Sequence, residues 1–190
     1  MKTIMIDLDD TIVTSGFKEL FKKFTNNEIC IEDNKEFYLE KLLPENKQKE
    51  FVNFILDNNT YDYVDFIKDA KEVIERLNKK YEIYICSAYV FKYHYEISGK
   101  ILNQKYEWIL KNMPFIDPKH IIFCNAKEVI DVDIKIDDKV SNLKTANDLK
   151  ILFTAYHNTH NAPIEELNEK KIVRANSWIE VEELINNLYN

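Results

Sequence analysis

Short apolar runs that end in polar side chains recur along this chain and constrain its fold more than any other feature. The runs lie near residues 2–6, 81–86, 120–124, 133–136 and 150–153. Helical spacing of apolar residues predicts helices between them, for example over residues 66–77, and a last helix that begins with a capping-box pattern at Ser177. Strands that alternate with helices form parallel sheets with right-handed crossovers. We therefore predict an α/β fold built on a doubly wound parallel sheet.

The first apolar run leads directly into the segment Asp7-Leu8-Asp9-Asp10-Thr11. An Asp-rich strand end can be a simple turn. However, Asp7 and Asp9 would repel each other, and holding both ionised without a cation between them is costly. A hard cation with oxygen ligands, most simply Mg²⁺, removes the repulsion and leaves one carboxylate free to attack a substrate. The segment is therefore a candidate site for both metal binding and catalysis.

A long insertion follows the first strand. About 50 residues separate it from the next regular unit of the sheet, far more than an ordinary strand-to-helix connection needs. They carry two helical patterns, one from Phe17 to Phe24 and one from Phe51 to Ile55. We interpret residues 14–64 as a small helical cap over the carboxyl end of the sheet, and residues 1–13 and 65–190 as the core.

Polar side chains also follow the later strands. Ser87 ends the second strand, Lys127 follows the third, and Asp137 and Asp138 end the fourth. Each alone has an ordinary explanation as a helix cap, a solvated charge or a turn. In open α/β sheets, however, the ligand crevice lies outside the carboxyl ends of the strands, so these groups are expected to converge there with the first acids. Together they predict a phosphoryl-transfer site.

Composition narrows the range of ligands. A net charge of −7 without a basic stripe argues against a nucleic-acid polymer as partner. The chain has only two glycines, Gly16 and Gly99, so it can form neither a Walker loop nor a GxGxxG dinucleotide motif. We expect a bound phosphate to be held by a metal, side chains and amides at helix starts.

The cysteines and the lengths of the apolar runs indicate in which cellular compartment the protein is expected. The three cysteines are odd in number and unpatterned in spacing, which suggests reduced thiols in an intracellular protein. The first apolar run is too short for a signal peptide, and no run approaches membrane-spanning length. We therefore expect a cytoplasmic protein that does not contact a membrane.

The set Asp7-Leu8-Asp9-Asp10-Thr11, Ser87, Lys127 and Asp137-Asp138 resembles the four motifs of the haloacid-dehalogenase-like phosphatases. The chain is more closely similar to the 5'(3')-deoxyribonucleotidases within that superfamily. That likeness rests on the following segments: Ile83-Tyr84-Ile85-Cys86-Ser87, Lys105-Tyr106-Glu107-Trp108, Ile134-Lys135-Ile136-Asp137-Asp138, Ile151-Leu152-Phe153-Thr154-Ala155-Tyr156-His157-Asn158 and Ser177-Trp178. The insertion matches only loosely.

The resemblance implies roles for the acids. Asp7 would be the nucleophile that forms an aspartyl-phosphate. Asp9 would protonate the leaving oxygen and then deprotonate the attacking water. Mg²⁺ would be held by Asp7, the backbone carbonyl of Asp9 and Asp138, with Asp137 bonding through water.

The resemblance also implies roles for the substrate-binding groups. Ser87 would hydrogen-bond a phosphoryl oxygen, and Lys127 would neutralise charge on the phosphoryl group. Lys105 is a candidate for a second phosphate contact. Phe37 and Tyr38 in the insertion are candidates to stack on a base or, alternatively, to pack inside the cap.

Some positions depart from the family pattern. Many animal members carry Gly-Val in place of Asp10-Thr11, a variation that the superfamily tolerates. Ala88 stands where a second hydroxyl often follows motif two, and Ser15 stands where an aromatic is expected to pack on the base. These departures leave the phosphatase chemistry intact and leave the nucleotide preference open.

Other polar residues are assigned no role in the chemistry. The run from His157 to His160 is interpreted as a loop over the edge of the crevice, because a zinc site would need a cysteine or third histidine nearby. Asp131 and Asp133, which precede the fourth strand, are expected to be solvated.

We predict a Mg²⁺-dependent phosphomonoesterase that acts on a small phosphate ester, most simply a (deoxy)ribonucleoside monophosphate. A phosphatase for a sugar phosphate or another small metabolite is the nearest alternative. A phosphorylation-dependent receiver-like switch fits less well, because Ser87 rather than an Asp ends the second strand. An inactive binding module is a further alternative. The family likeness also suggests a homodimer.

Overall fold

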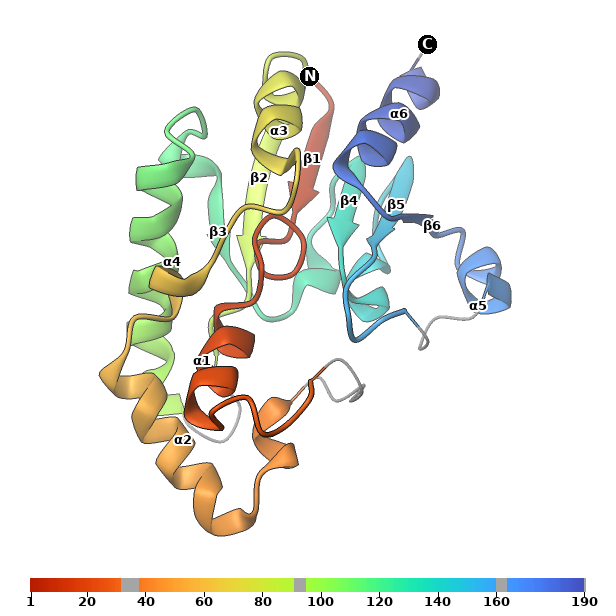
Figure 1. Ribbon diagram of the computed structural model, residues 1–190. Coiled ribbons are helices and arrows are strands. Elements are labelled where there is room, and N and C mark those ends of the chain that lie inside the picture. The colour runs from red at the N-terminus through yellow and green to blue at the C-terminus, as the bar shows by residue number, and fades with distance from the viewer. Residues whose placement is uncertain (32–37, 91–94, 160–163, 190) are drawn as a thin grey trace.

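A computed structural model describes residues 1–31, 38–90, 95–159 and 164–189 of the protein. A six-stranded parallel sheet forms its centre (Figure 1). The strand order is β3-β2-β1-β4-β5-β6. The strands are β1 (Thr3–Ile6), β2 (Glu82–Ser87), β3 (Ile121–Phe123), β4 (Ile134–Asp137), β5 (Leu149–Phe153) and β6 (Val173–Ala175). The predicted α/β class with a parallel sheet is confirmed.

Helices connect the strands. The α-helices are α1 (Gly16–Phe24), α2 (Glu45–Asp57), α3 (Ala70–Asn78), α4 (Ser98–Asn112), α5 (Ile164–Glu169) and α6 (Trp178–Tyr189). Short 3₁₀ helices are η1 (Leu39–Leu42), η2 (Thr60–Tyr63), η3 (Tyr95–Ile97), η4 (Pro118–His120), η5 (Lys127–Val129) and η6 (Val140–Leu143). None of the helices in the described part of the chain is both long and apolar enough to cross a membrane.

The main core lies on one face of the sheet. Alternate strand residues such as Ile4, Ile6, Ile134 and Ile136 point into it, because successive side chains of a strand point to opposite faces. Helices α3 and α6 and the end of α4 cover this face. The intervening residue of the central strand, Met5, packs on the opposite face in a smaller apolar cluster.

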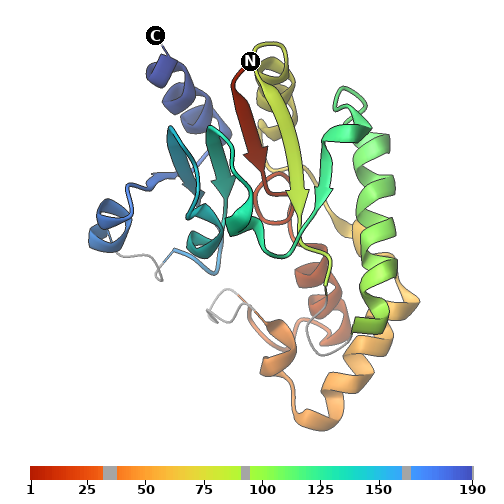
Figure 2. The same ribbon diagram turned by 180° about the vertical axis from the view of Figure 1, so that it is seen from behind.

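A second apolar cluster belongs to the segment between β1 and α3. Figures 1 and 2 show α1 and α2 beyond the carboxyl ends of the central strands, away from α3 and α6. Buried Leu20, Phe21, Phe51 and Ile55 from α1 and α2 pack together there, and Ile101 of α4 joins them. This segment therefore has a hydrophobic core of its own, which abuts the sheet at the edge where the strands end.

The structure differs from the sequence prediction at several elements. The helix predicted over residues 66–77 begins at Ala70, because Phe66 pairs with Val13 in an isolated bridge and Asp69 has a left-handed φ of 63°. The short elements β6 and α5 were not predicted. At the last helix, Ser177 caps the Glu180 amide as predicted, but the Glu180 carboxylate accepts from the backbone of Asn176.

Candidate active site

Asp7 directly follows β1 and remains in register with the sheet, where its backbone amide donates to the carbonyl oxygen of Ile136 at 2.9 Å. The chain then turns tightly, because the amides of Ile12 and Val13 both donate to the Leu8 carbonyl. The turn places Asp10 at a positive φ of 56°. Asp7 is buried and Asp9 is half-buried, so the two carboxylates lie at the floor of the crevice rather than in open solvent.

Asp137 ends β4 on the neighbouring strand and is fully buried. One carboxylate oxygen accepts the Lys139 amide at 2.9 Å, and both oxygens accept from Asn142, at 2.9 and 3.1 Å. Asp138 follows it and is also buried. Single carboxylate oxygens of Asp7, Asp137 and Asp138 lie within 4.8 Å of one another. The acids predicted at two different strand ends are thus brought together.

Lys127 lies between these acids. Its ammonium pairs with Asp7 and, at 3.1 Å, with Asp137, and its side chain is buried. Burial opposes the charge of Lys127, yet the two carboxylates raise its pKa above the ordinary value. Burial raises the pKa of Asp7 although Lys127 opposes this, and burial together with Asp7 and Asp137 raises the pKa of Asp138. One lysine therefore does not balance three buried carboxyl groups.

The donor set suits a hard cation. Clustered carboxylates offer the oxygen ligands that Mg²⁺ and Ca²⁺ take, without sulfur among them. Burial and the carboxylates of Asp7 and Asp137 raise the pKa of Asp138, and a cation held by these acids would offset the same repulsion. The arrangement of Asp7, Asp137 and Asp138 can therefore hold a divalent metal ion.

Ser87 and Lys105 form a second polar group around Asp9. The Lys105 ammonium, carried by α4, donates to Asp9 Oδ2 at 2.6 Å, to Ser87 Oγ at 2.8 Å and to the Ala88 carbonyl at 2.5 Å. Ser87 Oγ in turn lies 3.4 Å from Asp9 Oδ2. In this arrangement Lys105 contacts Asp9, Ser87 and the Ala88 carbonyl, and its predicted contact with a phosphate stays a prediction.

Tyr61 completes the surroundings of Asp9 and was not singled out in the sequence. Its hydroxyl donates to Asp9 Oδ1 at 2.5 Å. Burial acts to raise the pKa of Asp9, but Lys105 and Tyr61 lower it below the ordinary value. Burial and Asp9 raise the pKa of Tyr61, which keeps the phenol protonated.

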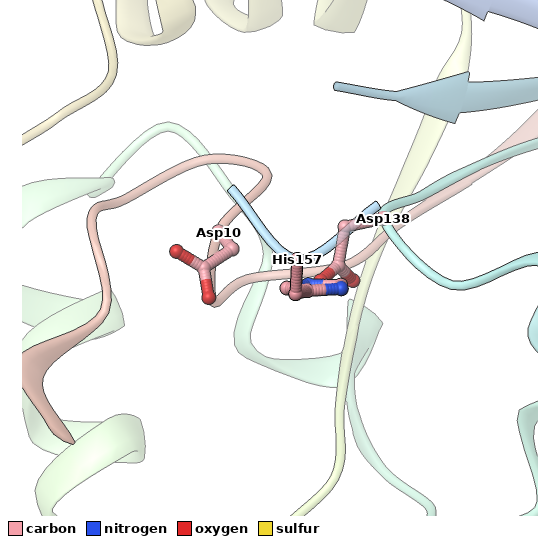
Figure 3. Close-up of side chains that lie close together, drawn as sticks. All are labelled: Asp10, Asp138 and His157. Carbon is pink, nitrogen blue, oxygen red and sulfur yellow. The ribbon is translucent and has the colours of Figure 1, made fainter. Parts of the chain in front are cut away.

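His157 is a second residue of the site to which the sequence assigned no chemistry. It follows β5 and is buried, and its Nε2 lies 2.6 Å from Asp138 Oδ2. Figure 3 shows its ring next to Asp138, with Asp10 nearby on the loop after β1. Burial and Lys139 lower the pKa of His157 to about 4 against the opposing charge of Asp137, so the ring is neutral near pH 7. His157 thus lies in a turn next to the site, in keeping with the predicted loop, and it is in addition a hydrogen-bonding partner of Asp138.

Asn158, the next residue after His157, connects the turn that follows β5 to the backbone of Asp138. Its side-chain amide donates to the carbonyl oxygens of Asp138 and Phe153, at 2.8 and 2.7 Å. Its own oxygen accepts from Arg174 on β6 at 2.9 Å. Asp138 is thus held through its side chain by His157 and through its backbone carbonyl by Asn158.

A cleft of about 540 Å³ lies over these residues. Asp7, Asp9, Lys105, Lys127 and Asp138 line its polar part, and Tyr38 and other aromatic side chains line the rest: Phe17, Phe51, Tyr89, Tyr95 and Tyr156. Ser15, where an aromatic was expected, also lines the cleft. Phe37 lies outside the described residues. The cleft therefore joins an acidic floor to an aromatic wall.

Nearly the whole chain matches one known family. The profile of the 5' nucleotidase, deoxy (pyrimidine), cytosolic type C family matches residues 1–189. The 5'(3')-deoxyribonucleotidase of Clostridium acetobutylicum is 32% identical, and the match covers 98% of this chain and 96% of that relative.

Solved structures with low sequence identity share the fold. A HAD family hydrolase from Deinococcus radiodurans, with bound phosphate and sodium, is 12% identical with a TM-score of 0.55, covering 99% of this chain and 96% of that one. A Bacillus subtilis protein assigned to the HAD hydrolases and bound to magnesium is 13% identical with a TM-score of 0.54, covering 97% and 98%. The resemblance found in the sequence motifs is thus confirmed. The chain belongs to the 5' nucleotidase, deoxy (pyrimidine), cytosolic type C family and is a phosphoric monoester hydrolase with the haloacid-dehalogenase-like fold.

Proposed function

We propose that this enzyme is a Mg²⁺-dependent phosphatase of (deoxy)ribonucleoside monophosphates that works through an aspartyl-phosphate on Asp7. The observation that carries the proposal is the position of the Asp7 carboxylate. It lies at the floor of the cleft, paired with Lys127 and within 4.8 Å of oxygens from Asp137 and Asp138. The family of the chain and its deoxyribonucleotidase relative support a nucleotide as substrate.

The metal ligands are proposed from the same cluster. Asp7, Asp138 and the backbone carbonyl of Asp9 would hold Mg²⁺, with Asp137 bonding through water. The Bacillus subtilis structural neighbour is bound to magnesium, which supports this choice of ion. When bound, the ion would offset the negative charge of the acids and of the phosphoryl group.

The chain's own groups would carry two successive steps. In the first, a carboxylate oxygen of Asp7 attacks phosphorus while the bond to the nucleoside oxygen breaks, and Asp9 gives that oxygen a proton. This step needs the protonated form of Asp9, which the lowered pKa of Asp9 makes the minor form in the free enzyme. In the second, Asp9 takes a proton from a water molecule that attacks the aspartyl-phosphate, which releases inorganic phosphate and frees Asp7. Lys127 and Ser87 would bind the phosphoryl oxygens in both steps.

Residues 14–64 are proposed to be the cap that selects the substrate. They supply Phe17, Tyr38 and Phe51 to the lining of the cleft that the acids of the core also line. A base is a flat aromatic group that stacks on such side chains. Tyr38 is thus proposed as a base contact, whereas a sugar phosphate would leave this wall without a stacking partner.

The experiment that tests the proposed function is a panel of substrates with purified protein. It compares deoxyribonucleoside and ribonucleoside 5'- and 3'-monophosphates with sugar phosphates and an aryl phosphate, each with and without Mg²⁺. We expect kcat/KM to be highest for the nucleoside monophosphates and to require the metal. A preference for sugar phosphates over every nucleotide would overturn the substrate assignment, and full activity in chelator would overturn the metal assignment.

A further inference from the structure

Tyr61 is a buried side chain that reaches the site from outside the four motifs. It lies on η2, which connects α2 to the core, and only 4% of its surface is exposed. Its hydroxyl donates to Asp9 Oδ1 at 2.5 Å, and its ring packs against Trp108 of α4 with ring centroids 6.0 Å apart. The phenol is therefore held in place by packing and directed at the group proposed as the acid and base.

Both oxygens of Asp9 are engaged, and from two different elements. Tyr61 donates to Oδ1 from η2, and Lys105 donates to Oδ2 from α4 at 2.6 Å. A carboxylate that accepts a hydrogen bond at each oxygen can no longer rotate freely about its Cβ–Cγ bond. Proton transfer requires that kind of fixed geometry at the reacting oxygen.

The elements that carry the two donors are bonded to each other. Gln104, the neighbour of Lys105 on α4, accepts from the Thr60 amide at 3.2 Å and donates to the Asn58 carbonyl at 3.3 Å. Gly16 at the start of α1 lies against the carbonyl group of the same residue, Thr60, so close that a Cβ there would be 2.2 Å from its oxygen. The position of the Tyr61 hydroxyl is thus set by contacts with both α1 and α4.

We propose that Tyr61 is a positioning residue that, together with Lys105, orients the Asp9 carboxylate for proton transfer to the leaving group. The inference rests on the proposed function, because it assumes that Asp9 is the proton donor. It adds a dependence on η2: a shift of this short helix would misdirect the Asp9 side chain while leaving the side chains of Asp7, Lys127 and Asp138 in place. Tyr61 itself gives up no proton in the reaction and acts only through Asp9.

The test compares a leaving group that must be protonated as it departs with one that does not need a proton. A nucleoside oxygen leaves as a poor, strongly basic alkoxide unless it is protonated, whereas p-nitrophenolate leaves readily as an anion. The experiment measures single-turnover release of nucleoside and of p-nitrophenol, with the full-length enzyme in excess and Mg²⁺ present. Single-turnover conditions isolate the first step from the later hydrolysis of the phosphoenzyme. Tyr61→Phe is compared with Tyr63→Phe, which removes a hydroxyl from the same short helix.

For Tyr61→Phe we expect nucleoside release to slow by roughly tenfold to a hundredfold, part of the ~10²–10⁴-fold that a positioned proton donor contributes. Release of p-nitrophenol should change little, and Tyr63→Phe should change neither. Equal slowing of both substrates would show a merely structural role and overturn the proposal. So would unchanged nucleoside release, or faster release, which is expected if Tyr61 acts only by lowering the pKa of Asp9.

A second variant keeps the test independent of the Tyr61 side chain. Gln104→Met removes both hydrogen bonds to the η2 segment, so it should show the same selective slowing of nucleoside release in weaker form; no selectivity would count against the proposal. If wild-type enzyme cleaves other alkyl phosphates but no nucleotide, the substrate assignment fails. The ratio of alkyl to aryl rates in Tyr61→Phe then still decides the role of Tyr61.

Discussion

At the scale of single residues, the site depends on how buried charges are partnered. Asp7 and Asp137 share Lys127, Asp9 is held by Lys105 and Tyr61, and Asp138 has His157 as its neighbour. The neutral His157 ring can donate one hydrogen bond, which fixes the Asp138 carboxylate without adding charge to the cluster. Groups that orient metal ligands in this way tune the affinity for the metal.

Replacing His157 therefore tests the proposed metal ligand. We expect His157→Ala to raise the Mg²⁺ concentration for half-maximal activity by roughly 10- to 100-fold, the usual effect of removing a partner of a metal ligand. The measurement is a Mg²⁺ titration of phosphatase activity. His120→Ala is the matched control, because His120 lies at the amino end of β3 and pairs with Glu82 at 3.3 Å. A lower melting temperature with unchanged Mg²⁺ dependence would contradict this role for His157.

At the scale of elements, a close approach of backbone joins the start of the insertion to its end. The start of α1 lies directly on η2, at a distance that only a residue without a side chain permits. Other contacts join elements of the sheet. Asp133, expected to be solvated, pairs with Lys2 at 2.8 Å and accepts from the amide and hydroxyl of Thr3, at 2.8 and 2.9 Å. The carboxylate stays partly exposed and is also paired, because the parallel register brings the starts of β1 and β4 together.

The two glycines give a paired test of the contact between α1 and η2. In Gly16→Ala the new Cβ would lie 2.2 Å from the Thr60 carbonyl oxygen, so the helices must move apart. We expect a loss of about 1–3 kcal/mol in the free energy of unfolding, as for other overpacked sites. Gly99→Ala, with nothing within 4 Å of the new Cβ, should instead gain about 0.5–1 kcal/mol because alanine favours the helix. Equal effects of the two variants in urea unfolding would refute the close contact.

The Asp133 contacts predict a pH dependence of stability. Hydrogen bonds from Lys2 and Thr3 lower the pKa of Asp133 to about 2 from its ordinary 3.8. Because the folded-state value is the lower one, the stabilisation is present above the ordinary pKa and is lost as pH falls toward 2. We expect Asp133→Asn to reduce the free energy of unfolding near pH 6 and to differ less from wild type at pH 3. Asp131→Asn is the control, because Asp131 is exposed. If the free energies of unfolding of Asp133→Asn and wild type differed equally at pH 6 and pH 3, the result would count against the Asp133 contacts.

At the scale of the whole molecule, the parallel sheet explains why much of the site could be predicted. Asp7, Ser87, Lys127 and the Asp137-Asp138 pair come at or just after strand ends, and parallel strands bring such ends to one edge. Strand periodicity alone therefore placed these groups together. The roles assigned to them, and the division into core and cap, remain predictions.

The rest of the site arises from packing that no local pattern encodes. Tyr61 looks like any aromatic of a short helix, and its contact with Asp9 depends on how η2 sits against α1 and α4. His157 lies in a turn after β5 and meets Asp138 only because β4 and β5 pair. The three-residue strand β6 has the sequence Val173-Arg174-Ala175, which contains no apolar run of the kind that marks the equally short β3.

The central claim is that Asp7 accepts the phosphoryl group at the point where the strand ends converge. The measurement that tests it most directly is mass spectrometry of the enzyme after acid quench during turnover of a nucleoside monophosphate with Mg²⁺. We predict one added phosphoryl group on the peptide that contains Asp7, and its absence, together with loss of turnover, in an Asp7→Asn variant that remains folded. A phosphoryl group on a different residue, or near-normal metal-dependent turnover by Asp7→Asn, would contradict the account.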